Sequence, residues 1–218
     1  MCIPKEIDTL KNDLLWAYYD LEEYKNIYCK DQNDLDILNE TALNFFVKLK
    51  EYLWERIILA ISRFIDSSIQ HGFYNLSLDS LKDIAKAADL PFFDDLVSQI
   101  NSIQNLVIPF KTYRSKLIAH RDLKYATSDD LKPETIYIEQ VEEIFSKIGT
   151  CINYFYEYFE HSSWHFQDSA KIRGAQSLFY FLRQGAIYVD MKLRRNDYSL
   201  DLKEEKESKY YNNSLTSS

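Results

Sequence analysis

The sequence predicts an all-α protein, an up-and-down helical bundle of five to six helices followed by a disordered C-terminal tail. Gly and Pro occur four times each in 218 residues, so the chain lacks the turn residues that a sheet of several strands needs. Long stretches repeat apolar residues at helical spacing. Hydrophobic residues make up 46% of the chain, enough to close one core at this length. We therefore expect one helical domain over residues 1–195 and a flexible polar tail over 196–218.

The apolar periodicity and its interruptions give the approximate bounds of each helix. A polar break at Asp31–Asp34 separates the first two helices, and the second contains Ile57–Ile61, which is apolar on every side and predicts the central helix of the bundle. Gly72 follows in a loop, and Ser77 is placed to cap a short helix that stops before Pro91. The predicted helices span about 5–28, 35–69, 78–88, 92–123, 138–159 and 167–193.

Two prolines divide the second half of the chain. Pro109 lies inside the predicted helix 92–123, where a proline removes a backbone donor and clashes with the preceding turn. We therefore expect a kink there, with a distinct helical segment beginning near Phe110. Pro133 marks the next loop.

The cysteines and the N-terminus bear on the compartment. Cys2, Cys29 and Cys151 are far apart and form no paired motif, which favours reduced thiols over a disulfide framework. The N-terminus lacks the basic-then-apolar pattern of a signal peptide, and no apolar run approaches the length of a membrane span. We expect a cytoplasmic protein with no membrane contact.

One stretch, Lys111–Lys124, reverses the sign of a chain whose net charge is −8. Local positive charge around an arginine and a histidine suits a site that handles phosphate. Basic residues also favour the last turn of a helix, where they offset the helix dipole, and on charge alone this plainer interpretation is stronger. The charged residues of the stretch are Lys111, Arg114, Lys116, Arg121, Asp122 and Lys124.

Arg114 and His120 form an R-x5-H pattern within this stretch. On an α-helix, positions six apart are separated by about 9 Å along the axis and by about 120° around it. One helix would not close both side chains on a single phosphate, whereas two copies meeting at a two-fold axis can share one cleft. The pattern is common by chance, so its context must carry any functional conclusion.

That context resembles a known family. YRSKLIAHRD, residues 113–122, is similar to the signature of the HEPN superfamily (higher eukaryotes and prokaryotes nucleotide-binding). ERIILAISRFID, at Glu55–Asp66, and NLSLDSL, at Asn75–Leu81, resemble the phage-resistance branch called abortive infection protein U. The likeness covers roughly Trp54 to Arg194.

The resemblance implies a metal-independent endoribonuclease that acts as a homodimer through the Arg114–His120 helix and needs no cofactor. It assigns Arg114, Ser115 and His120 to catalysis, and Lys111, Lys116 and Arg121 to RNA binding. RNA carries its own nucleophile in the 2′-OH, so cleavage needs proton transfer and positive charge but no metal ion. An antitoxin protein is a further candidate partner in a phage-defence or toxin–antitoxin setting.

Ser115 keeps a different interpretation open. The family more often has Asn, Asp or His beside the arginine, and Ser has a shorter reach. A catalytically inactive helical module that binds RNA or a protein is therefore the alternative.

Other polar residues have plainer explanations. His161 and His165 are four apart, as in some zinc sites, but no set of neighbouring ligands completes them, and a loop or helix-start pair is favoured. Arg56, Arg63 and Asp66 are spaced to form ion pairs along one helix face, with a structural role.

Overall fold

The structure is a computed structural model that describes residues 2–119, 134–169 and 174–195. Its elements, in chain order, are α1 (Lys5–Tyr28), α2 (Gln32–Phe64), β1 (Ile69–Gln70), β2 (Phe73–Tyr74), α3 (Leu78–Ala87), α4 (Phe93–Leu106), α5 (Ile108–Tyr113), the π-helical turn η1 (Arg114–Ala119), α7 (Ile138–Glu160), α8 (Phe166–Ser169) and α9 (Gly174–Arg195). The all-α bundle predicted from the sequence is confirmed. The predicted tail, 196–218, lies outside the described residues.

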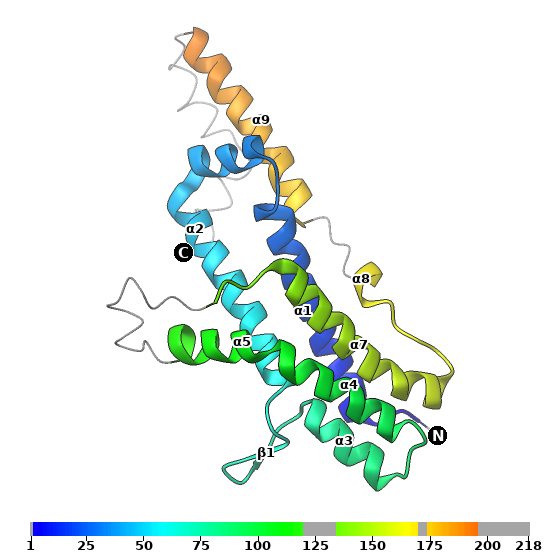
Figure 1. Cartoon of the computed structure of the whole chain (residues 1–218). Coiled ribbons are helices and arrows are strands. Elements are labelled where there is room, and N and C mark those ends of the chain that lie inside the picture. Colours follow the sequence, from blue (N-terminus) through cyan, green and yellow to red (C-terminus); the bar gives the residue numbers. More distant parts are fainter. Residues whose placement is uncertain (1, 120–133, 170–173, 196–218) are drawn as a thin grey trace, which may run out of the picture.

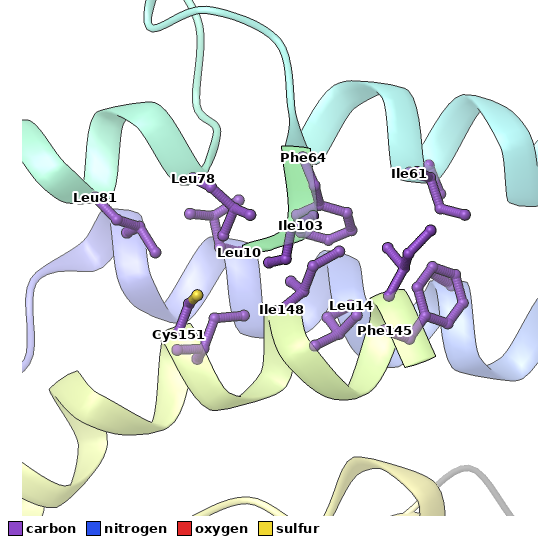
Figure 2. Close-up of a cluster of buried hydrophobic side chains, with 14 of the residues drawn as sticks. Leu10, Leu14, Ile61, Phe64, Leu78, Leu81, Ile103, Phe145, Ile148 and Cys151 are labelled. Atoms are coloured by element: carbon purple, nitrogen blue, oxygen red, sulfur yellow. The ribbon is translucent and has the colours of Figure 1, made fainter. Parts of the chain in front are cut away.

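The core lies where α1, α2, α4 and α7 pack together, with α3 against α4 (Figure 1). Side chains from these helices point toward one another, among them Leu14 of α1, Ile61 of α2 and Phe145 of α7 (Figure 2). The apolar segment Ile57–Ile61 is buried except at Leu59, which confirms α2 as a central helix. Cys151 is buried in this core, and all three cysteines are free thiols.

A second, smaller apolar cluster joins α1, the first half of α2 and the start of α9. Its buried members are Ile27, Leu38, Phe46, Ala175 and Phe179. The backbone of α2 departs from helical geometry at Ala42, between two of these buried residues, and this bend was not predicted.

The bend also positions a carboxylate for α9. Asp34, in the first turn of α2, is buried and forms an ion pair with Arg183 of α9. The first turns of α9 are therefore held by both apolar packing and charge.

The connection after α2 differs from the prediction. The helix ends at Phe64 rather than near Ile69, and β1 and β2 form a short antiparallel hairpin. His71 and Gly72 have positive φ values of 51° and 83°, as a tight reversal requires. Helix α3 begins after Ser77, as expected, and the backbone N–H of Ser77 donates a hydrogen bond to Ser80 Oγ at 3.1 Å.

The predicted break at Pro109 is confirmed. Helix α4 ends at Leu106, and α5 begins at Ile108 with Pro109 in its first turn, where a missing N–H costs least. The predicted helix 167–193 is instead α8 and α9, separated by residues outside the described part. Pro133 also lies outside it.

Asp8 ties α1 to α7 and makes stability depend on pH. Its carboxylate accepts hydrogen bonds from Lys11 Nζ at 2.6 Å and from the Tyr156 hydroxyl at 2.9 Å. The bond from Lys11, then that from Tyr156, lowers the pKa of Asp8 below its ordinary value of 3.8. A carboxyl with a lowered folded-state pKa stabilises the fold above pH 3.8, and this contribution is lost as the pH falls through the lowered pKa.

We therefore expect Asp8→Asn to weaken the dependence of stability on pH below about pH 4.5. The effect will be small, because the carboxyl is half exposed. Urea unfolding of the natural protein and the variant at neutral pH and near pH 3.5 measures it. Asn at the exposed Asp13 of the same helix is the control. An unchanged acid dependence in Asp8→Asn would contradict the assignment.

Candidate functional site

The Arg114 segment lies across the C-terminal half of α2. Both α5 and η1 pack against α2, and Phe110 of α5 is fully buried. Tyr113 is half-buried, and its burial, followed by the charges of Glu55 and Glu51, raises its pKa. Apolar anchors at the base of the segment therefore hold the polar side chains that follow at a defined place on the surface.

Arg114 begins a π-helical turn, η1, rather than continuing an α-helix. In a π-helix each N–H bonds the carbonyl five residues back, so a turn contains more residues than an α-turn, and such turns occur often at functional sites. The separation estimated for Arg114 and His120 assumed an α-helix, whereas Arg114–Ala119 form a π-helical turn. His120 and Arg121 lie outside the described residues, so the convergence of Arg114 with His120 stays a prediction.

The Arg114 guanidinium is held by Asp66. Arg114 Nη1 lies 3.0 Å from Asp66 Oδ1 in a hydrogen-bonded ion pair. The side chain of Arg114 is 38% exposed and that of Asp66 27% exposed, so the pair lies at the surface. A guanidinium has five N–H donors, and this contact uses one of them. Within the part of the chain that the structure describes, Arg114 is thus oriented by a carboxylate through one of its donors.

The other predicted side chains lie in the same segment of the chain. Lys111 on α5 and Ser115 on η1 are exposed, and Lys116 is half-buried. Lys111, Arg114, Ser115 and Lys116 follow one another within two turns, so three cations lie close together in the sequence. The described part of the site thus has the charge that a phosphate-binding surface needs.

Asp66 is the residue that sequence reasoning missed. It was expected to pair with arginines of its own helix, and that expectation was wrong: Arg56 pairs with Asp20 of α1, at 2.9 Å, and Asp66 pairs with Arg114. The signal was present, because Asp66 ends one of the three stretches that carry the resemblance and Arg114 lies in another. The two stretches meet at this ion pair.

The end of α2 is braced by the loop that follows it. The backbone N–H of Ser68 donates to Asp79 Oδ2 of α3 at 3.1 Å, and Asn75 Nδ2 donates to the Ser67 carbonyl at 2.9 Å. These bonds hold the chain immediately after Asp66. Asn75, the first residue of the Asn-Leu-Ser-Leu stretch, therefore helps to fix the backbone next to Asp66.

The histidine pair and the metal question are separate from this site. His161 is the left-handed C-cap residue of α7 and His165 lies in the loop before α8, so they do not share a helix face. This agrees with the loop or helix-start pair that the sequence favoured. Within residues 2–119, 134–169 and 174–195, His, Cys, Asp and Glu side chains form no group of three that would hold a metal ion. In the same ranges, no helix combines the length and hydropathy needed to cross a bilayer.

The all-α bundle is the fold that the resemblance to HEPN proteins implies. A family model described as AbiU2, of the HEPN class, matches residues 4–176. The match covers most of the chain, and the chain therefore belongs to the AbiU2 family of HEPN proteins. It begins much earlier than the resemblance noted from Trp54, since it includes α1, and it ends in the first turn of α9. The comparisons with curated proteins and with solved structures found no match.

Proposed function

We propose that this abortive-infection HEPN protein is a metal-independent endoribonuclease whose composite site is shared by two copies of the chain. The observation that carries the proposal is Arg114, held by Asp66 at the surface, in a chain of the AbiU2 family. The proposed setting is phage defence or a toxin–antitoxin system, with an antitoxin protein as partner.

The reaction would use the nucleophile of the RNA itself. His120, or its symmetry mate, accepts the 2′-OH proton while the 2′-oxygen attacks phosphorus, and the resulting imidazolium gives that proton to the departing 5′-oxygen. The bond from phosphorus to the 5′-oxygen breaks, leaving a 2′,3′-cyclic phosphate and a 5′-hydroxyl. Arg114 stabilises the negative charge that develops on the phosphorane oxygens. The Ser115 hydroxyl, next to Arg114 in the chain, donates a hydrogen bond to the same phosphorane oxygens.

Substrate binding would rest on charge rather than on base recognition. Lys111, Lys116 and Arg121 contact flanking phosphates, which positions RNA without reading its sequence. Because the chain as a whole is strongly acidic, RNA affinity is expected to be modest and to fall steeply with added salt.

A catalytically inactive binding module is the second candidate, and one contact favours it. Asp66 partly neutralises Arg114, which leaves less positive charge for a phosphorane. In such a module the Arg114 surface would bind RNA or a protein without cutting.

The nature of the cleaved ends separates these candidates. In excess chelator, the natural protein should cut a mixed-sequence RNA and leave 2′,3′-cyclic phosphate and 5′-hydroxyl ends. An RNA with 2′-deoxy substitutions throughout should stay intact, because it lacks the nucleophile. Binding of RNA without cleavage would favour the inactive module.

Asp66 is proposed as a positioning residue for Arg114. We expect Asp66→Asn, which keeps the shape and removes the charge, to lower the cleavage rate by about 10- to 100-fold, as misplaced catalytic groups typically do. KM should change little, since Lys111 and Lys116 bind the flanking phosphates. The assay is initial cleavage rate against RNA concentration.

The matched control is Asp20→Asn, which removes the carboxylate of the Arg56 pair on another surface. Its cleavage rate should stay within about two-fold of the natural protein, because exposed ion pairs contribute little to stability. Equal losses in both variants would mean that Asp66 acts only through folding.

A further inference from the structure

Most of α9 extends beyond the bundle. Its start is docked, with Ala175 and Phe179 buried in the second apolar cluster and Arg183 paired with Asp34. Every residue from 183 to 191 is exposed, and the helix projects from the body in Figure 1. The family match ends at residue 176, so the projecting part lies outside the shared domain.

The projecting part is nevertheless apolar on one face. At 100° per residue, this face is centred on Gln184 and lies opposite the docked face that holds Ala175 and Phe179. A projecting helix of this length gains little stability in water on its own, and exposed apolar surface of this extent marks an interaction site. Its exposed side chains, with exposed fractions, are Tyr180 (60%), Phe181 (70%), Ile187 (53%), Tyr188 (47%) and Met191 (46%).

The remaining segments of the chain are poor candidates to cover this face. Residues 196–218, which follow α9, contain three leucines and three tyrosines among mostly charged, hydroxyl and amide side chains. Residues 120–133 are similarly polar, with two leucines and one tyrosine. In both segments these side chains are interspersed with charged residues, so neither offers a continuous apolar stripe. The occupant is therefore another molecule.

We propose that this occupant is the same face of a second copy, packed antiparallel across a two-fold axis at Gln184. Such an arrangement brings Phe181 beside the second copy's Tyr188 and Tyr180 beside its Ile187, so that the side chains of the two copies interdigitate. A two-fold contact requires a self-complementary surface, and this stripe is one. The Gln184 amide both donates and accepts hydrogen bonds, so it can bond its own mate at the axis and fix the register.

The apolar area of the α9 face agrees with the area that a dimer interface buries. Half-exposed side chains of this size cover roughly 100 Å² each, so two copies would bury about 1,000 Å² through the stripe alone. That is the threshold for a specific interface. The observations that carry the α9 interface do not depend on cleavage.

The first test is the mass of the full chain in solution, by sedimentation or by light scattering, at micromolar concentrations. The natural protein should be a dimer and Ile187→Asp a monomer with unchanged helical circular dichroism. Phe73→Asp, which changes a still more exposed apolar side chain on β2, should remain a dimer. A monomeric natural protein, or an Ile187→Asp dimer, would overturn the inference.

The second test fixes the register. In a background with Cys2→Ser and Cys29→Ser, Gln184→Cys should form a covalent dimer on mild oxidation. Gln176→Cys should not, because antiparallel pairing places residue 176 and its mate about 24 Å apart along the helix axis. Equal cross-linking of the two variants would overturn the antiparallel arrangement.

RNA cleavage measured on the same samples keeps the two proposals distinct. If Ile187→Asp is monomeric and still cuts RNA, the α9 interface stands and the composite site is wrong. If the natural protein is monomeric and cuts RNA, the α9 interface is wrong and the ribonuclease stands.

Discussion

Arg114→Ala is expected to lower RNA cleavage by about 10³-fold, the upper range for removing one donor that stabilises transition-state charge. The guanidinium offers several donors in a planar fork, and alanine offers none. Arg114→Lys should recover only a small part of the rate, because an ammonium cannot reproduce the fork and loses the geometry set by Asp66. Single-turnover cleavage rates measure both variants.

Arg56→Ala is the control for this experiment. Arg56 and Arg114 each pair with an aspartate from another part of the chain, so both substitutions break one ion pair at the surface. Thermal unfolding should show similar stabilities for the two variants. A cleavage rate for Arg114→Ala within about three-fold of that for Arg56→Ala would contradict a catalytic role.

Phe145→Ala is expected to destabilise the fold by about 3–5 kcal/mol. Phe145 is fully buried on α7, its ring centroid lies 5.2 Å from that of Tyr18 on α1, and truncation leaves a cavity between these helices (Figure 2). A loss of this size is a large fraction of the stability of a typical domain. Urea unfolding should show a lower midpoint with an unchanged slope.

Tyr158→Ala on the same helix is the matched control. Tyr158 is 42% exposed, and its ring contacts Phe92 and Phe159 near the surface. The cost should be about 1 kcal/mol, because most of the truncated surface is not packed in the core. If Phe145→Ala costs no more than Tyr158→Ala, the packing of α7 on α1 is not as described.

The helices with regular apolar spacing were the predictable part of the fold. The predicted 5–28 and 138–159 agree closely with Lys5–Tyr28 and Ile138–Glu160. The bend at Ala42 was not predictable, because alanine is the best helix former and the bend follows from burying Leu38 and Phe46 around α9. The early end of α2 was missed because the hairpin after it continues the apolar pattern.

The candidate site was predictable in its residue types and less so in its geometry. The charge reversal and Pro109 placed Arg114 on a separate segment, as the structure has it. The π-helical turn has no sequence signature, since it depends on how α5 packs against α2. The contact of Asp66 with Arg114 links positions 48 apart in the chain, a separation that local periodicity does not register.

The most direct test of the central claim compares the natural protein, Arg114→Ala and His120→Ala in RNA cleavage with excess chelator. The natural protein should cut RNA, and neither variant alone should. A mixture of the two variants should recover part of the rate, because a mixed dimer still brings one Arg114 and one His120 to the shared cleft. Equal trace cleavage by all three folded proteins would contradict a ribonuclease site at Arg114 and His120.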